Sequence, residues 1–167
     1  MTPLPFPLGH GPLVGWRLDA ASHAADWDSG EGAYRAGGRW NGKGVRAVYG
    51  SVDPAAAILE VAVHKGFAAL DTVPHVLTSF EIIDPAAVTV IDPATLPNPN
   101  WLRPGIPSAG QQTFGDEMLA QHRVLLLPSA VSPQSWNWLF VAAHAAGTYR
   151  MLTQERFALD TRLSPPI

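Results

Sequence analysis

The segment GGRWN at Gly37–Asn41 is the part of the sequence from which the rest is best understood. Its two adjacent glycines let the main chain approach another group closely or adopt a positive φ. Arg39 adds a permanent positive charge, and Tyr49 and Glu60 follow a short distance along the chain. A chain that only needs to fold seldom gathers a guanidinium, two aromatic rings and a carboxylate so closely. We therefore expect this segment to belong to a functional site.

Local signals around this segment predict a β-hairpin. Arg39 and Trp40 stand where a first strand would begin, Asn41-Gly42 is a strong turn dipeptide, and Val45–Tyr49 has the character of a returning strand. A surface hairpin with an exposed Trp40 and no further role is the simpler interpretation of the same pattern.

The composition is that of a globular protein. Of the 167 residues, 47% are hydrophobic and 15% are charged, which suits one domain over residues 1–167 with a substantial core. Residues 1–13 are rich in proline, and we expect them to form an extended lead-in. The 16 prolines and 15 glycines favour short elements joined by ordered loops.

Charge and cysteine content exclude several classes of function. The net charge is −3 and the 11 Lys and Arg residues form no run, which argues against direct nucleic-acid binding because phosphate neutralisation needs clustered cations. Cysteine is absent, which excludes thiolate metal sites and is consistent with a cytoplasmic location. The N-terminus lacks the pattern of a secretory signal, and no apolar run approaches the ~20 residues that span a bilayer. We expect no membrane association.

The helix expected at Pro54–Lys65 carries the first candidate carboxylate. Ser51 or Asp53 can cap its start, Pro54 suits its first turn, and Gly66 follows its end. Glu60 and His64 lie one turn apart on this helix, and the neighbouring alanines leave space beside the carboxylate. A Glu–His pair on a solvated face is the simpler interpretation. The pair lacks the second histidine of a metalloprotease motif, so we expect no metal.

The remaining periodicity predicts a series of short elements. Strands are expected at Val14–Leu18, His75–Ile83, Val88–Ile91, Arg123–Leu127 and Phe157–Leu163; helices are expected at Ala20–Asp28, Thr113–Gln121 and Trp136–Ala146; the run Leu96–Gly110 is too rich in proline and asparagine for regular structure. Such a long irregular loop within a small protein is often functional.

Two further polar residues stand next to predicted strands. Arg17 lies within the first strand, where a solvated charge is the simpler interpretation. Ser129 follows the buried strand at Arg123–Leu127, but it lacks the G-x-S-x-G context of a nucleophile elbow. An ordinary turn serine is therefore the simpler interpretation of Ser129, and we do not expect it to be a nucleophile.

Together these residues resemble the RES domain, the toxin of Xre–RES type II toxin–antitoxin systems, which is named for an Arg, a Glu and a Ser. The resemblance runs from about residue 14 to the C-terminus and preserves the order of the motifs. The matching positions are Arg17, Gly37–Asn41, Tyr49 with Ser51, Glu60, Leu127–Val131, Asn137, and the terminal Phe157, Asp160, Arg162 and Leu163. The GGRWN segment followed by a Tyr and a helical Glu is the specific part. One departure is Val141-Ala142, which stands where the family commonly has a second Asn-Pro.

The resemblance implies an α+β fold with an ADP-ribosyltransferase-like core of small twisted antiparallel sheets surrounded by short helices. It also implies NAD⁺ as the substrate. Cleavage of the nicotinamide–ribose bond passes through an oxocarbenium-like state, which a carboxylate such as Glu60 would stabilise. Arg39 and Arg17 would bind the pyrophosphate, and Tyr49 would offer a flat face to nicotinamide.

The resemblance thus assigns two sets of site residues. The catalytic set is Glu60, Arg39 and Tyr49. The substrate-binding set is Arg17, Gly38, Trp40, Asn41, Ser51, Ser129 and Asn137.

The function that these expectations favour is a toxin that consumes NAD⁺ by hydrolysis or phosphorolysis. An alternative is an ADP-ribosyltransferase that modifies a cellular protein, and a third possibility is a non-catalytic binding module. The resemblance further implies a cognate Xre-like antitoxin that blocks the active site. Trp101 and Trp136, if exposed, would be compatible with such a partner surface.

Overall fold

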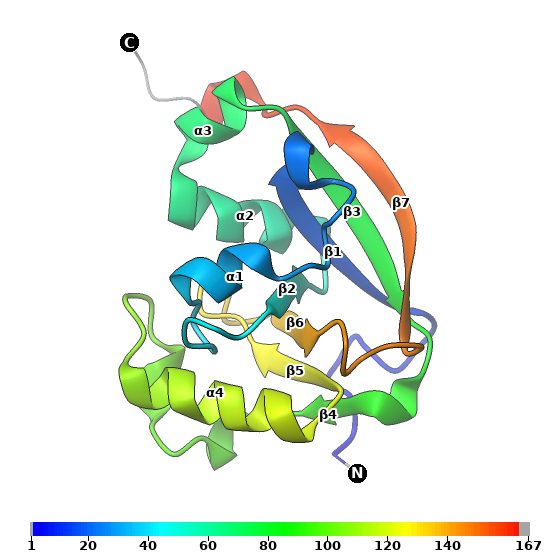
Figure 1. Ribbon diagram of the computed structural model, residues 1–167, viewed down its shortest axis with the longest axis vertical. Coiled ribbons are helices and arrows are strands. Elements are labelled where there is room, and N and C mark those ends of the chain that lie inside the picture. Colours follow the sequence, from blue (N-terminus) through cyan, green and yellow to red (C-terminus); the bar gives the residue numbers. More distant parts are fainter. Residues whose placement is uncertain (1, 164–167) are drawn as a thin grey trace.

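Seven strands form one hydrogen-bonded sheet in the computed structural model, which describes residues 2–163 (Figure 1). The strand order is β4-β5-β6-β2-β1-β3-β7, and every neighbouring pair is antiparallel except β4 and β5. The strands are β1 (Leu13–Ala20), β2 (Ala47–Ser51), β3 (His75–Ile82), β4 (Val88–Val90), β5 (Val124–Pro128), β6 (Trp136–Val141) and β7 (Tyr149–Phe157).

The sheet consists of two parts that meet at a narrow seam. Strands β1, β3 and β7 form one part, and β2, β6, β5 and β4 form the other. Among the described residues, β1 and β2 pair only between Trp16 and Ser51, whereas β1 and β3 pair along their whole length. The two parts run at a steep angle to each other in Figure 1. This twisted arrangement confirms the predicted α+β fold class, and its two parts correspond to the small sheets that were expected.

Four α-helices and several 3₁₀ turns surround the sheet. The helices are α1 (Glu31–Ala36), α2 (Pro54–Lys65), α3 (Phe67–Thr72) and α4 (Ala109–Gln121), and the 3₁₀ turns are Ala21–His23, Pro85–Ala87, Pro93–Thr95, Pro99–Leu102 and Thr161–Leu163. Helix α2 packs against β1 and β2, and α4 packs against β5 and β6 (Figure 1). None of the helices within residues 2–163 has the length and apolar character that crossing a membrane requires.

Helix α2 has the bounds that its sequence predicts. The Asp53 side chain accepts a hydrogen bond from the Ala56 N–H at 2.7 Å, and Pro54 occupies the first turn, where a missing N–H costs nothing. Gly66 has a φ of 78° and ends the helix. The side-chain cap alone stabilises such a helix by about 1 kcal/mol.

Strand β5 is buried on both faces, as its continuous apolar sequence predicts. Val124 and Leu126 contribute to a core cluster that contains Phe80 and Trp138. Leu125 lies on the opposite face, in a second cluster beneath α4. A third cluster lies under α2 and α3 and includes Leu18, Ala62 and Leu70.

The helix predicted at Trp136–Ala146 is wrong. This segment is β6 followed by turns. Trp138 and Phe140 enter one core cluster while Leu139 enters the other, so the segment follows the two-residue period of a strand. Because both faces of this strand are apolar, the sequence shows no alternation of apolar and polar residues. The aromatic and β-branched residues, which favour strands, indicated the structure better than the alanines that follow them.

Three further predictions need correction. The expected helix at Ala20–Asp28 is only a 3₁₀ turn at Ala21–His23, and α1 begins later, after Gly30. The expected closing strand at Phe157–Leu163 lies earlier, at Tyr149–Phe157, where it pairs with β3. Residues 6–9 of the expected extended lead-in form turns, and Met1 lies outside the described residues.

Candidate active site

The GGRWN segment lies in an ordered loop, residues 37–46, and the hairpin prediction is therefore wrong. Only its second arm is a strand, β2. The first arm makes no ladder with β2. Instead the Trp40 N–H donates to the Tyr49 hydroxyl at 2.9 Å, and that hydroxyl donates to Asn41 Oδ1 at 2.7 Å. We call residues 37–46 the arginine loop.

Asn41 and Gly38 give the arginine loop its shape. Asn41 is fully buried, and its amide nitrogen lies within hydrogen-bonding distance of the carbonyl oxygens of Ala33, Gly42 and Val45. A Cβ on Gly38 would lie 2.6 Å from both the Tyr49 hydroxyl and Asn41 Oδ1. Both residues therefore support the backbone of this loop.

Trp40 is buried, contrary to the exposed ring of the predicted hairpin. Its side chain is 1% exposed and packs against Trp101 and Phe114, with ring centroids 6.4 and 6.3 Å away. The ring presents no open face in this structure, so Trp40 anchors the loop in the core beneath α4. Trp101, which was expected to be exposed, is itself half-buried against these rings, and Trp136 is also half-buried.

One face of α4 carries the arginine loop. The Gln112 amide donates to the Gly38 carbonyl at 2.9 Å, and both Asp116 carboxylate oxygens lie 3.1 Å from the Gly42 nitrogen. Between them Gly115 allows direct backbone contact, because a Cβ there would lie 1.8 Å from the Trp40 carbonyl oxygen. The sequence analysis did not identify these three residues. Their spacing places them on one face of a helix, but nothing in the sequence indicates that this face contacts the arginine loop.

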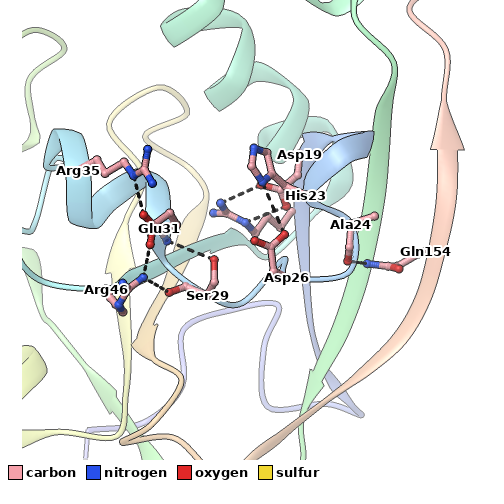
Figure 2. A network of polar contacts seen from close by, with 10 residues as sticks. Asp19, His23, Ala24, Asp26, Ser29, Glu31, Arg35, Arg46 and Gln154 are labelled. Carbon is pink, nitrogen blue, oxygen red and sulfur yellow. Dashed lines mark hydrogen bonds and ion pairs between the residues drawn. The ribbon is translucent and has the colours of Figure 1, made fainter.

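The far end of the arginine loop is attached to α1 by charge. Glu31 accepts from Arg46 and from Arg35, the latter at 2.5 Å (Figure 2). These hydrogen bonds, first that of Arg46 and then that of Arg35, hold the pKa of Glu31 below its usual range.

The Arg39 side chain is bonded to carbonyl oxygens of another loop, residues 101–105. Its guanidinium donates to Trp101 O at 3.3 Å, to Arg103 O at 3.4 Å and to Gly105 O at 2.8 Å. Arg39 also lines a cavity of about 210 Å³, together with Arg103, Asn98, Asn100, Trp101, Pro104, Ile106, Ser108 and Gln111. Polar and apolar groups contribute about equally to the surface of this cavity.

Glu60 is held by two side chains from the other end of the sequence. Its Oε1 accepts from Asn137 Nδ2 at 2.8 Å and from Ser129 Oγ at 3.3 Å. Ser129 is 2% exposed, and its hydroxyl also accepts from the Ser132 N–H at 3.1 Å. Among the described residues nothing donates to Glu60 Oε2, and the residue is partly exposed. One carboxylate oxygen is thus anchored and the other is open.

Ser51 completes this group. Its hydroxyl donates to Asn137 Oδ1 at 3.1 Å, while β2 and β6 pair at these same two positions. We call Ser51, Glu60, Ser129 and Asn137 the carboxylate cluster. No hydrogen bond links Glu60 to His64 among the described residues.

Arg17 is bound to a carboxylate that the sequence analysis did not consider. Its Nε donates to Asp19 Oδ2 at 2.9 Å, and Nη2 lies 2.9 Å from Asp19 Oδ1. Nη1 donates to the Tyr49 carbonyl oxygen at 2.9 Å, across the seam between β1 and β2. Successive side chains of a strand point to opposite faces, so Arg17 and Trp16 lie on different faces of β1. Trp16 is the residue that pairs with Ser51 of the carboxylate cluster. The structure therefore does not bring Arg17 into contact with the carboxylate cluster.

Tyr49 lies between the arginine loop and the carboxylate cluster. Burial raises its pKa well above the usual range, and the negative charges of Asp116 and Glu60 add to this. The Trp40 N–H and the charge of Arg39 act in the opposite direction. Tyr49 is therefore a neutral hydroxyl at physiological pH and cannot serve as a base.

Strand β2 thus brings together most of the residues that the resemblance selected. The Tyr49 side chain contacts the arginine loop and Ser51 belongs to the carboxylate cluster, whereas Arg17 reaches β2 only at the Tyr49 carbonyl. Within residues 2–163 no three His, Asp or Glu side chains are arranged to hold a metal ion.

The family of the chain follows from a comparison with known protein families. The model of the RES domain matches residues 14–160. The chain belongs to the RES domain family. The resemblance inferred from the sequence is therefore confirmed over residues 14–160.

Two characterised relatives of this RES domain protein are named as toxins. "Toxin Res" of Pseudomonas putida is 31% identical over 156 residues, which cover 90% of this chain and 99% of the relative. "Prs ADP-ribosylating toxin" of Sphingobium sp. is 36% identical over 137 residues, which cover 77% of this chain and 82% of the relative.

A solved structure shares the fold of this RES domain protein. It is the crystal structure of the M. tuberculosis MbcT–MbcA toxin–antitoxin complex, of which one chain aligns with a TM-score of 0.70 and 21% identity. The alignment covers 89% of this chain and 85% of that chain. At this identity the similarity concerns the fold.

Proposed function

We propose that this RES domain protein is a toxin that consumes NAD⁺ by cleaving the bond between nicotinamide and ribose. The observation that carries the proposal is the way in which the Glu60 carboxylate is hydrogen-bonded. Its Oε1 is anchored by Asn137 and Ser129, while Oε2 has no protein donor among the described residues. A carboxylate held in this way can face a developing positive charge without first reorganising.

The reaction requires little covalent chemistry from the protein. The bond between ribose C1′ and the nicotinamide nitrogen breaks, and its electron pair leaves with neutral nicotinamide. The ribose then has oxocarbenium character, which Glu60 stabilises electrostatically. Water or phosphate adds its oxygen to C1′ and releases a proton, and the product is ADP-ribose or its 1″-phosphate.

The diphosphate of NAD⁺ fits the charge of Arg39. Its guanidinium is now satisfied by three neutral carbonyl oxygens. A phosphate oxygen would compete well with these, because hydrogen bonds between charged partners are roughly twice as strong as neutral ones. Tyr49 contributes as a neutral group that fixes the arginine loop next to the carboxylate cluster.

A second candidate function is transfer of ADP-ribose to a cellular protein. The observation that favours it is the relative named "Prs ADP-ribosylating toxin", at 36% identity. The first half of the chemistry is the same, and only the acceptor at C1′ changes. Hydrolysis and transfer are therefore separated by what reaches the ribose, not by the carboxylate cluster.

A toxin of this kind requires control in the cell that produces it. We infer a cognate antitoxin of the Xre-like type that covers the active site, because the solved protein with the same fold is in a toxin–antitoxin complex. NAD⁺ as the substrate places this activity in the cytoplasm.

The test is release of nicotinamide from NAD⁺ by the purified protein. Glu60→Gln should lower the rate by about 100-fold or more, because it removes the charge that faces the transition state. Glu117→Gln is the matched control, since Glu117 is exposed on α4 away from the carboxylate cluster. Mass spectrometry of candidate acceptor proteins separates transfer from hydrolysis. If no nicotinamide is released with or without protein acceptors, both enzymatic functions are excluded.

A further inference from the structure

Strand β2 presents two hydroxyl groups on one face, and each is bonded to a buried asparagine. Tyr49 and Ser51 are two residues apart, so their side chains leave the strand on the same side. Tyr49 donates to Asn41 Oδ1 at 2.7 Å, and Ser51 donates to Asn137 Oδ1 at 3.1 Å. The two asparagines are 0% and 9% exposed.

This arrangement determines which way the Asn137 amide faces. With its oxygen bonded to Ser51, its nitrogen is directed at Glu60 and donates to Oε1 at 2.8 Å. The reversed amide would place its oxygen against the carboxylate, where two acceptors repel each other. Glu60 therefore sets the orientation of the amide, and the Ser51 hydroxyl, which can donate or accept, bonds to the other end of the same side chain.

We propose that Ser51 and Asn137 are positioning residues that hold the carboxylate of Glu60, and that neither binds the substrate. The proposal rests on the proposed function, in which Glu60 faces the reacting ribose. Ser51 is 2% exposed and is committed to Asn137, and both ends of the Asn137 amide are occupied. The structure thus gives these residues a different role from the substrate contacts that the family resemblance implies.

The consequence for catalysis is an effect on kcat. Without the Asn137 donor, the carboxylate can rotate away from the position it needs in the transition state, and misplacement by about 1 Å can cost ~100-fold in rate. Binding of NAD⁺ in the ground state would change little, because the adenosine and diphosphate ends do not depend on this carboxylate.

The kinetic test compares Ser51→Ala, Asn137→Ala and the double variant in nicotinamide release. Asn137→Ala should lower kcat by about 10-fold to 100-fold and Ser51→Ala by about 3-fold to 10-fold, with KM within about twofold. If Ser51 acts through Asn137, the double variant should lose no more than Asn137→Ala alone. Losses that multiply in the double variant, or that appear mainly in KM, would overturn the proposal.

Ser79→Ala is the matched control for Ser51→Ala. Ser79 is 3% exposed and its hydroxyl is bonded to Thr153 at 2.6 Å, so the same buried hydroxyl is removed from the neighbouring part of the sheet. It should cost similar stability and leave kcat unchanged. An equal loss of kcat in both serine variants would assign the effect to stability, and the positioning role would be rejected.

A measurement that does not depend on activity tests the geometry itself. The side-chain ¹⁵N–¹H signals of Asn137 are identified by their loss in Asn137→Ala. In Glu60→Gln these signals should shift from their wild-type positions, because the amide then donates to a neutral oxygen and not to a carboxylate. Ser51→Ala should move the signals. Signals that are insensitive to Glu60 would refute the positioning role even in an active enzyme, whereas signals that behave as expected in an inactive protein would refute only the proposed function.

Discussion

The arginine loop and the carboxylate cluster are both attached to β2, through Tyr49 and Ser51, yet they are held in opposite ways. In the carboxylate cluster, side chains from β2, α2, β6 and the end of β5 bond to one another. In the arginine loop, the backbone is held, through Gly38 O, Trp40 N and Gly42 N. The cluster should therefore respond to the loss of single functional groups, and the loop should respond to changes in backbone shape.

The largest effect should come from Gly115→Ala, which tests the backbone contact of the arginine loop. The new Cβ would lie 1.8 Å from the Trp40 carbonyl oxygen, so either α4 or the loop must move. We expect a loss of about 3 kcal/mol or more in the free energy of unfolding, at the upper end for overpacking. Urea denaturation measures it.

Gly110→Ala is the control for this prediction. Gly110 lies in the first turn of the same helix, and the nearest atom to its Cβ would be 3.8 Å away. It should leave the stability equal or slightly higher, because alanine is the better helix former. If Gly110→Ala and Gly115→Ala lost similar stability, the backbone contact between Gly115 and the arginine loop would not be the cause of the loss.

Asp116→Ala should have the next largest effect. It removes both acceptors of the Gly42 N–H, and leaving such a group without its partner costs about 1 to 3 kcal/mol. Nicotinamide release should fall as well, since the loop that carries Arg39 loosens. Combined with Ser51→Ala, the two losses of activity should multiply, because the residues share no bond. Strong coupling would contradict the independence of the two regions.

Asp53→Ala should have a smaller effect, on the side of the carboxylate cluster. Asp53 caps α2 through the Ala56 N–H and also accepts from the Ser135 hydroxyl at 3.0 Å. The expected cost is about 1 to 2 kcal/mol in the free energy of unfolding, measured by thermal or urea denaturation. Asp53→Asn keeps a cap acceptor and should recover most of the loss. No recovery would mean that the capping bond is not the cause.

The smallest expected effect is on the pH dependence of stability, through Glu31. Its pKa in the folded protein is lowered from 4.5, first by Arg46 and then by Arg35. A lowered folded pKa means that the stabilisation is present above pH 4.5 and is lost as the pH falls through the folded value. The urea midpoint of Glu31→Gln should thus lie below that of the wild type at pH 7, and the difference should shrink towards pH 3. A difference independent of pH would exclude the charge as its cause.

The two regions also differ in how well the sequence predicted them. Helix α2 was predictable because Asp53, Pro54 and Gly66 are local signals for its start and end. Ser129 and Asn137 were selected by the family resemblance, and the structure brings both to Glu60. The geometry that joins them is long-range, since Asn137 and Glu60 are 77 positions apart in sequence.

The arginine loop was mispredicted for a physical reason. Asn41-Gly42 is a common hairpin turn, but the Tyr49 hydroxyl and α4 supply the hydrogen bonds that a strand ladder would otherwise make. Tertiary contacts thus override the local signal. For the same reason Gln112 and Asp116 had no distinguishing pattern, because each acts on a segment that only the folded chain brings near.

The narrow seam of the sheet has a mechanical consequence. Where β1 meets β2, Trp16 and Ser51 form the pair that joins the two parts, and Ser51 also holds the amide that orients Glu60. Helix α2 packs against both β1 and β2, so Glu60 is carried by an element that touches both parts of the sheet. Sliding one part against the other would break the Arg17–Tyr49 and Trp138–Val14 hydrogen bonds. It would also disrupt the core that Phe80 and Trp138 share, so the seam holds Glu60 in place although few strand-pairing bonds cross it.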